Sequence, residues 1–572
     1  MTALRLRPWQ RAAFDRFVAL DDGGGDTAGQ TANFLAVATP GAGKTTFALA
    51  CARWALSQQR RRLVVVAPTS HLKIQWSLAA HRLGLQLDPA WTPAGGIAKD
   101  VHGIVTTYQQ VATGDTANVL KGVCHDAFVI LDELHHAGDE KAWGDAVQLA
   151  FSTAHRRLCL SGTPFRSDTA SIPFVRYDDD QAFADYEYGY GDALRDGGVV
   201  RPVYFPRVDG NMEWSAPDGA VLSASFQDEL ARDGMSQRLR AALSLDGEWL
   251  PHVLERAHER LTYLRDSQAE AGGLVIAMDQ EHAQGIARLI RMRFGVSADV
   301  VISDDPGASK KITAFAESDA PWLVSVRMVS EGVDIPRLRV GVYASTVSTE
   351  LFFRQAVGRF VRWQSGRASQ KAFVYLPDDV RLRTHAFQIM ESRRHVLGRH
   401  DPGDDVIETG IAERDAPLDD VPAELGGPEQ LSLFSVLSAV ATGIEIHAMT
   451  PSGVAIPFEF GEDEVDLPEP SEFGDSESGE LLELHLPDIP TDAGWGPGPG
   501  RSVFEIKDEL RERNANLAKR LVDVTGWGHA RVNGEMNRLG NVVAVSSATT
   551  DQLERRLRKS EEWLAHLRKR RP

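Results

Sequence analysis

The chain has 572 residues, too many for one hydrophobic core, and this length predicts roughly three or four domains. A net charge of −18 argues against a nucleic-acid-binding protein only if it is evenly spread, and it is not. Residues 401–500 carry 24 acidic side chains and one basic side chain, residues 501–572 have a net charge of +6, and residues 1–400 are near −1. The acidity therefore belongs to one segment.

Cysteine content and apolar runs exclude several classes of protein. The three cysteines are far apart and form no CxxC pair, which argues against a zinc module and favours a reducing compartment. The start, "MTALRLRPWQ", lacks an apolar signal segment, and no run approaches the roughly 18 apolar residues that cross a bilayer. We expect a soluble cytoplasmic protein without a membrane partner.

Strand-like apolar runs alternate with helical patterns in two series, which is typical of parallel sheets with crossover helices. The first series comprises 34–38, 62–68, 103–108, 127–132 and 157–162. The second comprises 273–278, 298–303, 322–326, 339–345 and 371–377. The sequence therefore predicts an α/β protein with two such units in tandem, joined by residues of about 200–270.

After residue 400 the composition changes. Residues 401–430 and 461–500 are rich in Asp, Glu, Pro and Gly, as in linkers and disordered segments. Between them, "LSLFSVLSAVATGI" at 431–444 is interpreted as a buried helix. From 501 the chain reads as helical, beginning with a predicted capping box in which Ser502 is the N-cap and Glu505 lies three residues on.

The stretch "ATPGAGKTT" at 38–46 has the composition of a phosphate-binding loop between a strand and a helix. Gly41 and Gly43 let backbone N–H groups turn toward an anion, and Lys44 reaches the β- and γ-phosphates. The Thr45 hydroxyl is a ligand for Mg²⁺. The alternative is a glycine-rich turn before a helix. We predict an ATP site with Mg²⁺.

The stretch "FVILDELHH" places two carboxylates directly after another apolar strand. Asp132 would hold Mg²⁺, directly or through water, and Glu133 would polarise the attacking water. His135 could link the nucleotide to a neighbouring segment. The alternative is a solvated turn. A zinc site at the two histidines is excluded because adjacent side chains diverge and no Cys or Glu cluster accompanies them.

These motifs carry a resemblance to the DEAD/DEAH-box superfamily 2 helicases and translocases. The ordered matches are "LRPWQ" at 6–10, "GAGKT" at 41–45, "APTSHLKIQW" at 67–76, "TTYQ" at 106–109, "DELH" at 132–135, "SGTP" at 161–164, "SEGVDIP" at 330–336 and "QAVGRFVR" at 355–362. Within the superfamily, the variants look most like the branch of XPB-like and RadD-like repair helicases and the motor subunits of type I and III restriction enzymes.

The resemblance implies two tandem RecA-like domains with ATP between them, and a smaller, mainly helical C-terminal region after an acidic linker. The division expected is a first RecA-like domain at 1–200, a connecting segment at 201–270, a second RecA-like domain at 271–400, an acidic, partly disordered segment with a small apolar island at 401–500, and a basic helical region at 501–572. In this family, ATP closes the cleft and hydrolysis releases it.

The resemblance also assigns roles to residues. Gln10 would read the adenine edge, while Arg359 and Arg362 would reach the γ-phosphate from the second domain. The implied catalytic group is Lys44, Asp132, Glu133, His135, Gln355, Arg359 and Arg362. The implied nucleotide contacts are Gln10, Pro40, Gly41, Ala42, Gly43, Lys44, Thr45, Thr46, Gly332, Asp334, Arg359 and Arg362.

The expected partner is nucleic acid, with DNA favoured over RNA, in DNA repair or phage defence. Thr69, Thr107 and Thr346 are candidates for phosphate contacts, because short hydroxyls position a backbone without reading its sequence. A structural role for each threonine is the alternative. An RNA helicase, or an ATP-gated DNA-binding subunit of a larger assembly, remains open as the function.

The C-terminal parts leave further alternatives. The acidic run at 461–484 is either a disordered spacer or a mimic of a nucleic-acid backbone that restrains the ATPase. Residues 501–572 form either a nucleic-acid clamp or a docking bundle for protein partners. Asp488 with "FEIK" at 504–507 echoes a nuclease core, but the predicted helix start argues against that reading.

Overall fold

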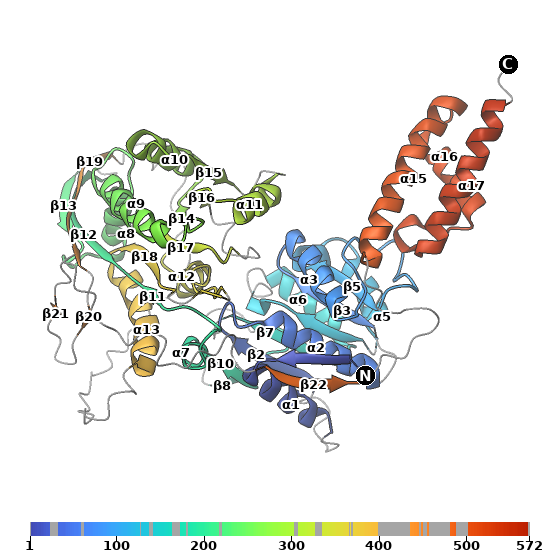
Figure 1. Ribbon diagram of the computed structural model, residues 1–572, viewed down its shortest axis with the longest axis horizontal. Helices are drawn as coiled ribbons and strands as arrows, with labels where there is room; N and C mark the ends of the chain where they lie inside the picture. Colours follow the sequence, from blue (N-terminus) through green and yellow to red (C-terminus); the bar gives the residue numbers. More distant parts are fainter. Residues whose placement is uncertain are drawn as a thin grey trace. The chain divides into compact units, whose positions relative to one another are not determined.

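The structure is a computed structural model, and contacts divide the chain into two compact units (Figure 1). The first comprises Met1–Val37, Gly43–Glu187 and Leu481–Pro572, and the second Ala38–Ala42 and Tyr188–Glu480. The structure describes residues 2–22, 32–58, 62–125, 127–135, 141–162, 172–178, 181–216, 220–302, 307–326, 335–364, 366–367, 370–397, 435–445, 448–449, 455–456, 481–487 and 501–569. The five-part division expected from the sequence remains a prediction.

The first unit is built on a seven-stranded sheet of order β10-β2-β7-β6-β3-β5-β4. Its strands are β2 (Asn33–Ala38), β3 (Leu63–Ala67), β4 (Leu87–Asp88), β5 (Gly103–Thr107), β6 (Phe128–Leu131), β7 (Arg156–Ser161) and β10 (Tyr186–Tyr188). All strands from β2 to β7 run parallel. The five predicted strands are confirmed, and their side chains are almost all buried, as in sheets covered on both faces.

Helices of the first unit follow the strands along the chain. They are α1 (Pro8–Asp22), α2 (Lys44–Gln58), α3 (Ser70–Arg82), α4 (Tyr108–Ala112), α5 (Thr116–Val123) and α6 (Lys141–Phe151). Because the strands are parallel, the loops that lead from β2, β3, β5 and β6 leave the same edge of the sheet. Motif residues far apart in the sequence are thereby gathered at that edge.

The second unit holds a nine-stranded sheet. Seven strands follow the order β13-β12-β18-β17-β14-β16-β15, and the other two are β11, which pairs with β18, and β19, which pairs with β12. Its strands are β11 (Val203–Tyr204), β12 (Arg207–Ser215), β13 (Val221–Ser225), β14 (Gly272–Ala277), β15 (Ala298–Val301), β16 (Trp322–Val326), β17 (Leu338–Ala344), β18 (Ala372–Pro377) and β19 (Ser435–Glu445). Its helices are α7 (Tyr190–Arg195), α8 (Arg232–Ala242), α9 (Trp249–Ser267), α10 (Gln280–Phe294), α11 (Ala308–Glu317), α12 (Glu350–Val357) and α13 (Val380–Leu397). The second predicted series of strands is confirmed, and so is the α/β fold class.

Short two-stranded pairs complete the strand inventory of the described residues. One pair is β8 (Tyr177–Asp178) with β9 (Gln181–Ala182), and another is β20 (Ala448–Met449) with β21 (Ala455–Ile456). None of the described helices combines the length and apolar character that crossing a membrane requires.

The helix predicted at 431–444 is wrong, because most of this stretch is strand β19. It pairs antiparallel with β12 along nearly its whole length, with two register shifts. Its small and β-branched side chains fit a pleated surface, and Ala439 is buried against the core. Pairing with a distant strand therefore decided the structure of a segment whose apolar content fits either type.

The end of the acidic segment forms a strand. Strand β22 (Leu482–Leu486) pairs antiparallel with β1 (Thr2–Leu6), and Leu484 lies opposite Leu4 (Figure 1). The alternation in "LELHL" turns Leu484 and Leu486 inward and leaves the intervening side chains exposed. Residues 461–480 of the proposed backbone mimic, and Asp488, lie outside the described residues.

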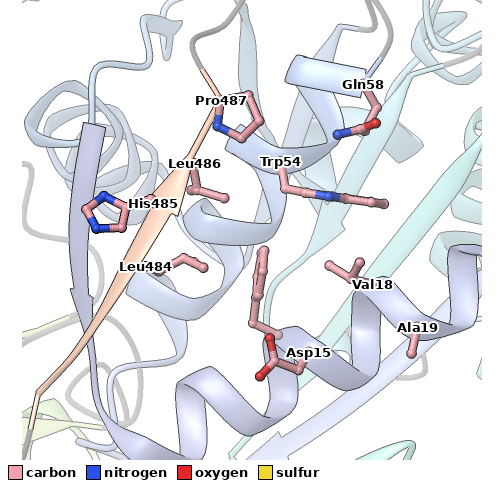
Figure 2. A pocket seen from close by; sticks show the side chains of 10 residues that line it. Asp15, Val18, Ala19, Trp54, Gln58, Leu484, His485, Leu486 and Pro487 are labelled. Atoms are coloured by element: carbon pink, nitrogen blue, oxygen red, sulfur yellow. The ribbon is translucent and has the colours of Figure 1, made fainter. Parts of the chain in front are cut away.

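Strand β22 also borders a pocket of about 340 Å³ between β22, α1 and α2 (Figure 2). Figure 2 shows Leu484 and Leu486 of β22 on one side of this pocket and Val18 of α1 on the other. None of the predicted site residues lines this pocket. Strand β22 thus covers part of α1 and α2.

The C-terminal region is a bundle of three helices, as predicted (Figure 1): α15 (Val503–Thr525), α16 (His529–Gly540) and α17 (Thr550–Lys569). The capping box is confirmed, since the Ser502 hydroxyl accepts from the Glu505 N–H and the Glu505 carboxylate accepts from the Ser502 N–H. Because "FEIK" lies in α15, the nuclease-like pattern has no strand to carry it.

Charged hydrogen bonds attach the bundle to the first sheet. The fully buried Lys507 donates to Asp100 Oδ1 at 2.5 Å, and the other oxygen of Asp100 accepts from the backbone N–H and hydroxyl of Thr550, both at 2.8 Å. Arg511 donates to Asp88, in β4, at 3.3 Å. The bundle is therefore held beside the β4 end of the sheet by polar contacts.

Inside the bundle, a buried arginine joins all three helices. Arg556 of α17 is 1% exposed and donates to the side-chain oxygens of Asn514, Asn533 and Asn537 at 2.7–2.8 Å. Burial lowers the pKa of Arg556. The buried cation is thus hydrogen-bonded by neutral amides and not by a carboxylate. Because the hydrogen bonds come from all three helices, the network favours one packing of the helices.

We expect Arg556→Met to lower the free energy of opening of the bundle by about 3 kcal/mol, because the side-chain oxygens of one buried and two half-buried asparagines lose their donors. Hydrogen–deuterium exchange of amides in 503–569 measures this quantity. The control is Arg555→Met, since Arg555 is exposed on the same helix. Equal effects of the two substitutions would contradict the prediction.

Candidate nucleotide site

The loop between β2 and α2 has the geometry of a phosphate cradle. Gly41 and Gly43 have φ values of 84° and 95°, a region that favours glycine. The Gly43 carbonyl accepts from the N–H groups of Thr46 and Phe47, which starts α2 at Lys44. The positive end of α2 therefore faces the loop, as anion binding requires.

Gln10 of α1 packs directly against this loop. Its side chain is 3% exposed, its Nε2 donates to the Gly43 carbonyl at 2.9 Å, and its Oε1 accepts from the Arg7 N–H at 2.8 Å. A Cβ added at Gly43 would lie 2.6 Å from Gln10 Nε2, so only glycine fits. The adenine-reading role of Gln10 stays a prediction.

Glu133, at the end of β6, is held at the start of α2. Its Oε1 lies 3.1 Å from Lys44 Nζ, and its Oε2 accepts from the Gly162 N–H at 3.0 Å. Its φ of 45° is a strained value for a residue with a side chain. Burial would raise the pKa of Glu133, but the charge of Lys44, with His135 and the Gly162 N–H, holds it well below its usual value.

Asp132 is oriented by a tryptophan from α3. Its Oδ2 accepts from Trp76 Nε1 at 2.8 Å, and its backbone carbonyl accepts from the Tyr108 hydroxyl at 2.9 Å. Burial and the charge of Glu133 raise the pKa of Asp132 to about 6. His135 Nδ1 lies 3.8 Å from Glu133 Oε2. The predicted carboxylates and Lys44 are therefore together at one edge of the sheet.

Trp76 is a site residue that motif reading missed. It ends the quoted stretch "APTSHLKIQW", yet nothing in the linear sequence says that its indole N–H reaches Asp132. Trp76 lies on α3, seven residues after Thr69, and is almost completely buried. Its contact with Asp132 could be predicted only if β3 and β6 were known to be neighbouring strands.

We expect Trp76→Phe to shift the acid limb of kcat/KM for ATP hydrolysis upward by about one pH unit. The indole N–H lowers the pKa of Asp132, so its removal raises that pKa further, and activity is lost at a higher pH as the pH falls. The control is Trp91→Phe, since Trp91 is equally buried but donates to the Gly96 carbonyl. An unchanged acid limb would contradict the role of Trp76.

The residues predicted in the second unit lie on and after α12. Gln355 is in α12, and Arg359 and Arg362 follow it, with Arg359 8% exposed. Contacts group Ala38–Ala42 with this unit, and a Cβ added at Gly41 would lie 3.4 Å from Arg362 Cδ. The roles of these arginines at the γ-phosphate remain predictions.

Two of the three threonines predicted to contact nucleic acid cap helices of the first unit. The Thr69 hydroxyl accepts from the Leu72 N–H at 3.5 Å and caps α3, and the Thr107 hydroxyl accepts from the Gln110 N–H at 3.1 Å and caps α4. Thr346, after β17, is half-buried. Phosphate contacts at all three stay predictions. Gly332 and Asp334 lie outside the described residues.

The donor set at the loop fits magnesium. Mg²⁺ prefers hard oxygen ligands, often one or two carboxylates and a hydroxyl beside substrate phosphates. Thr45, in the first turn of α2, and Asp132, oriented by Trp76, offer such oxygens. Over the described ranges, no cluster of three or more His, Cys, Asp or Glu side chains suggests another metal centre.

The chain is similar in sequence to known proteins. Residues 3–166 match the family model "Type III restriction enzyme, res subunit". Protein Rv2917 of Mycobacterium tuberculosis is 44% identical over 442 residues, covering 73% of this chain and 71% of its own. Protein ML1624 of Mycobacterium leprae is 37% identical over 573 residues, covering 96% and 93%.

A solved fragment of a proposed HsdR subunit of a type I restriction enzyme from Vibrio vulnificus YJ016 aligns with 66% of this chain and 65% of that chain, at 17% identity and a TM-score of 0.45. The chain belongs to the family of these mycobacterial proteins, and its residues 3–166 are similar to the res subunit of type III restriction enzymes. This relationship indicates an ATP-hydrolysing enzyme.

Proposed function

We propose that the protein is a nucleic-acid-dependent ATPase that translocates on DNA or unwinds it. The observation that carries the proposal is the position of the Glu133 carboxylate, 3.1 Å from Lys44 Nζ and 3.0 Å from the Gly162 N–H. Phosphoryl transfer to water needs a loop that binds the phosphates, a lysine and an ionised carboxylate. All three are present here, and the lysine contacts the carboxylate.

Each residue has a distinct task in this proposal. Lys44 neutralises charge on the transferred phosphoryl group, and Glu133 orients and deprotonates the attacking water. Mg²⁺ held by Thr45 and Asp132 supplies further charge neutralisation when bound. Arg359 and Arg362 of the second unit stabilise the transition state, because the guanidinium is planar and always charged.

The nucleic-acid partner is proposed to be DNA, bound through its phosphates and without base reading. The support is the resemblance of the motifs to the repair and restriction branch, together with helix N-termini at Thr69 and Thr107 that could meet phosphates. We further propose a cytoplasmic role in DNA repair or phage defence.

The decisive test is the ATP turnover of the full chain with single-stranded DNA, duplex DNA or RNA, at two salt concentrations. Stimulation by DNA that weakens at higher salt supports the proposal. Stronger stimulation by RNA would favour an RNA helicase. Slow turnover that no nucleic acid stimulates, combined with nucleotide-dependent binding to a partner, would favour an ATP-gated subunit. Lys44→Ala is the background control.

A further inference from the structure

Arg201, which precedes β11, holds two carbonyls of a separate segment of the second unit. Its side chain is fully buried, its Nη1 donates to the Leu338 carbonyl at 3.1 Å, and its Nη2 donates to the Pro336 carbonyl at 2.6 Å. Both carbonyls belong to the end of the "SEGVDIPRL" stretch at 330–338, which contains the "SEGVDIP" match and the two residues after it. Burying a charged side chain is costly, so this arrangement persists only with such hydrogen bonds.

The backbone of the same residue holds the segment that carries Arg362. The Arg201 N–H donates to the Val361 carbonyl at 2.9 Å, and Val200 forms an antiparallel bridge with Arg362. One residue therefore contacts the end of one motif through its side chain and another motif through its backbone.

A tyrosine fixes Arg201 from a third direction. The Tyr190 hydroxyl, from α7, donates to the Arg201 carbonyl at 3.0 Å and accepts from the Val203 N–H at 3.0 Å. Between these two groups lies Pro202, which has no N–H of its own. This bridge leaves Arg201 little freedom to shift along the chain.

The pair formed by Val200 and Arg362 lies against Gly41, which belongs to the same unit by its contacts. A Cβ added at Gly41 would lie 3.4 Å from Arg362 Cδ and 3.7 Å from Val200 Cγ1. A displacement of the Arg201 backbone would therefore be passed to the guanidinium of Arg362.

We propose that Arg201 is a positioning residue that ties the end of the "SEGVDIPRL" stretch to the backbone of Arg362, so that a movement of one is transmitted to the other. The proposal rests on the proposed ATPase function for its consequence in catalysis. Lysine cannot replace this residue, because a single ammonium cannot reach two carbonyls with the geometry of a planar fork.

The test compares ATP turnover of Arg201→Met and Arg201→Lys with that of Arg238→Met. Arg238 is a matched control, since it is 1% exposed, lies in α8 of the same unit and donates to the Ser225 and Asp228 carbonyls, which belong to neither motif. We expect a roughly 10- to 100-fold loss of kcat in both Arg201 variants. The KM for ATP should stay within about threefold.

A double variant separates positioning from general destabilisation. If Arg201 acts through Arg362, Arg201→Met combined with Arg362→Ala should turn over within about twofold of Arg362→Ala alone. Multiplied losses in the double variant, or an equal loss of kcat in Arg238→Met, would overturn the proposal.

Hydrogen–deuterium exchange of the full chain gives a readout that needs no ATPase activity. Arg201→Met should speed amide exchange at 335–339 and 358–364, whereas Arg238→Met should leave both ranges unchanged. Unchanged exchange at 358–364 in Arg201→Met would refute the proposed link between Arg201 and the segment that carries Arg362. A wild-type chain without nucleic-acid-stimulated turnover would instead refute the proposed function.

Discussion

Replacing Glu133 with Gln should lower kcat for ATP hydrolysis about 10³-fold while ATP still binds. The amide keeps the size of the side chain but cannot accept the proton of the attacking water. ATP affinity should be equal or higher, because Lys44 loses the carboxylate that lies 3.1 Å away and is then available to the phosphates. Single-turnover hydrolysis and equilibrium binding of a fluorescent ATP analogue measure the two quantities.

The matched control for this substitution is Glu187→Gln, which removes an exposed carboxylate of the same unit. It should leave both kcat and ATP affinity unchanged. Sustained turnover in Glu133→Gln would show that another group prepares the water, and the assignment of the site would then be wrong. Loss of ATP binding in Glu133→Gln would instead point to a structural role for the carboxylate.

Replacing Arg362 with Ala is the second substitution with a large expected effect, a loss of kcat of about 10³-fold. A guanidinium that meets the γ-phosphate stabilises charge that develops in the transition state, so ATP affinity should change much less than kcat. Arg362→Lys should recover little activity, since the ammonium lacks the planar fork. Steady-state kinetics with saturating DNA and varied ATP separate the two parameters.

Arg367→Ala is the control for Arg362, because Arg367 is exposed five residues further along the chain and pairs with Glu270. Its substitution should leave kcat unchanged. A fully active Arg362→Ala would contradict the proposed role of Arg362 at the γ-phosphate.

Strands and phosphate-loop chemistry were predictable from the sequence for local reasons. A parallel sheet covered on both faces needs continuous apolar runs, and each of the ten predicted runs is a strand. The loop at Gly41 and Gly43 was predictable because few residues other than glycine adopt its backbone conformation. The capping box at Ser502 is equally local, since both partners lie within one helical turn.

Predictions that depended on distant partners fared differently. The stretch 431–444 has too little periodicity to distinguish a helix from a strand. Pairing with β12 determines that most of it is a strand. The composition around β22 is that of an acidic linker, so the strand could not be predicted from the sequence. It forms by pairing with β1, near the other end of the chain.

By itself, the sequence determined the fold class, because this depends on local composition and strand-length apolar runs. The ordered motifs indicated the family and predicted the residues of a triphosphate site. Only the tertiary structure decided that Trp76 orients Asp132, that Gly162 and Lys44 hold Glu133, and that Arg201 bridges two motifs. Such contacts join residues tens to more than a hundred positions apart. Their hydrogen bonds depend on which strands are neighbours, and no local pattern encodes that.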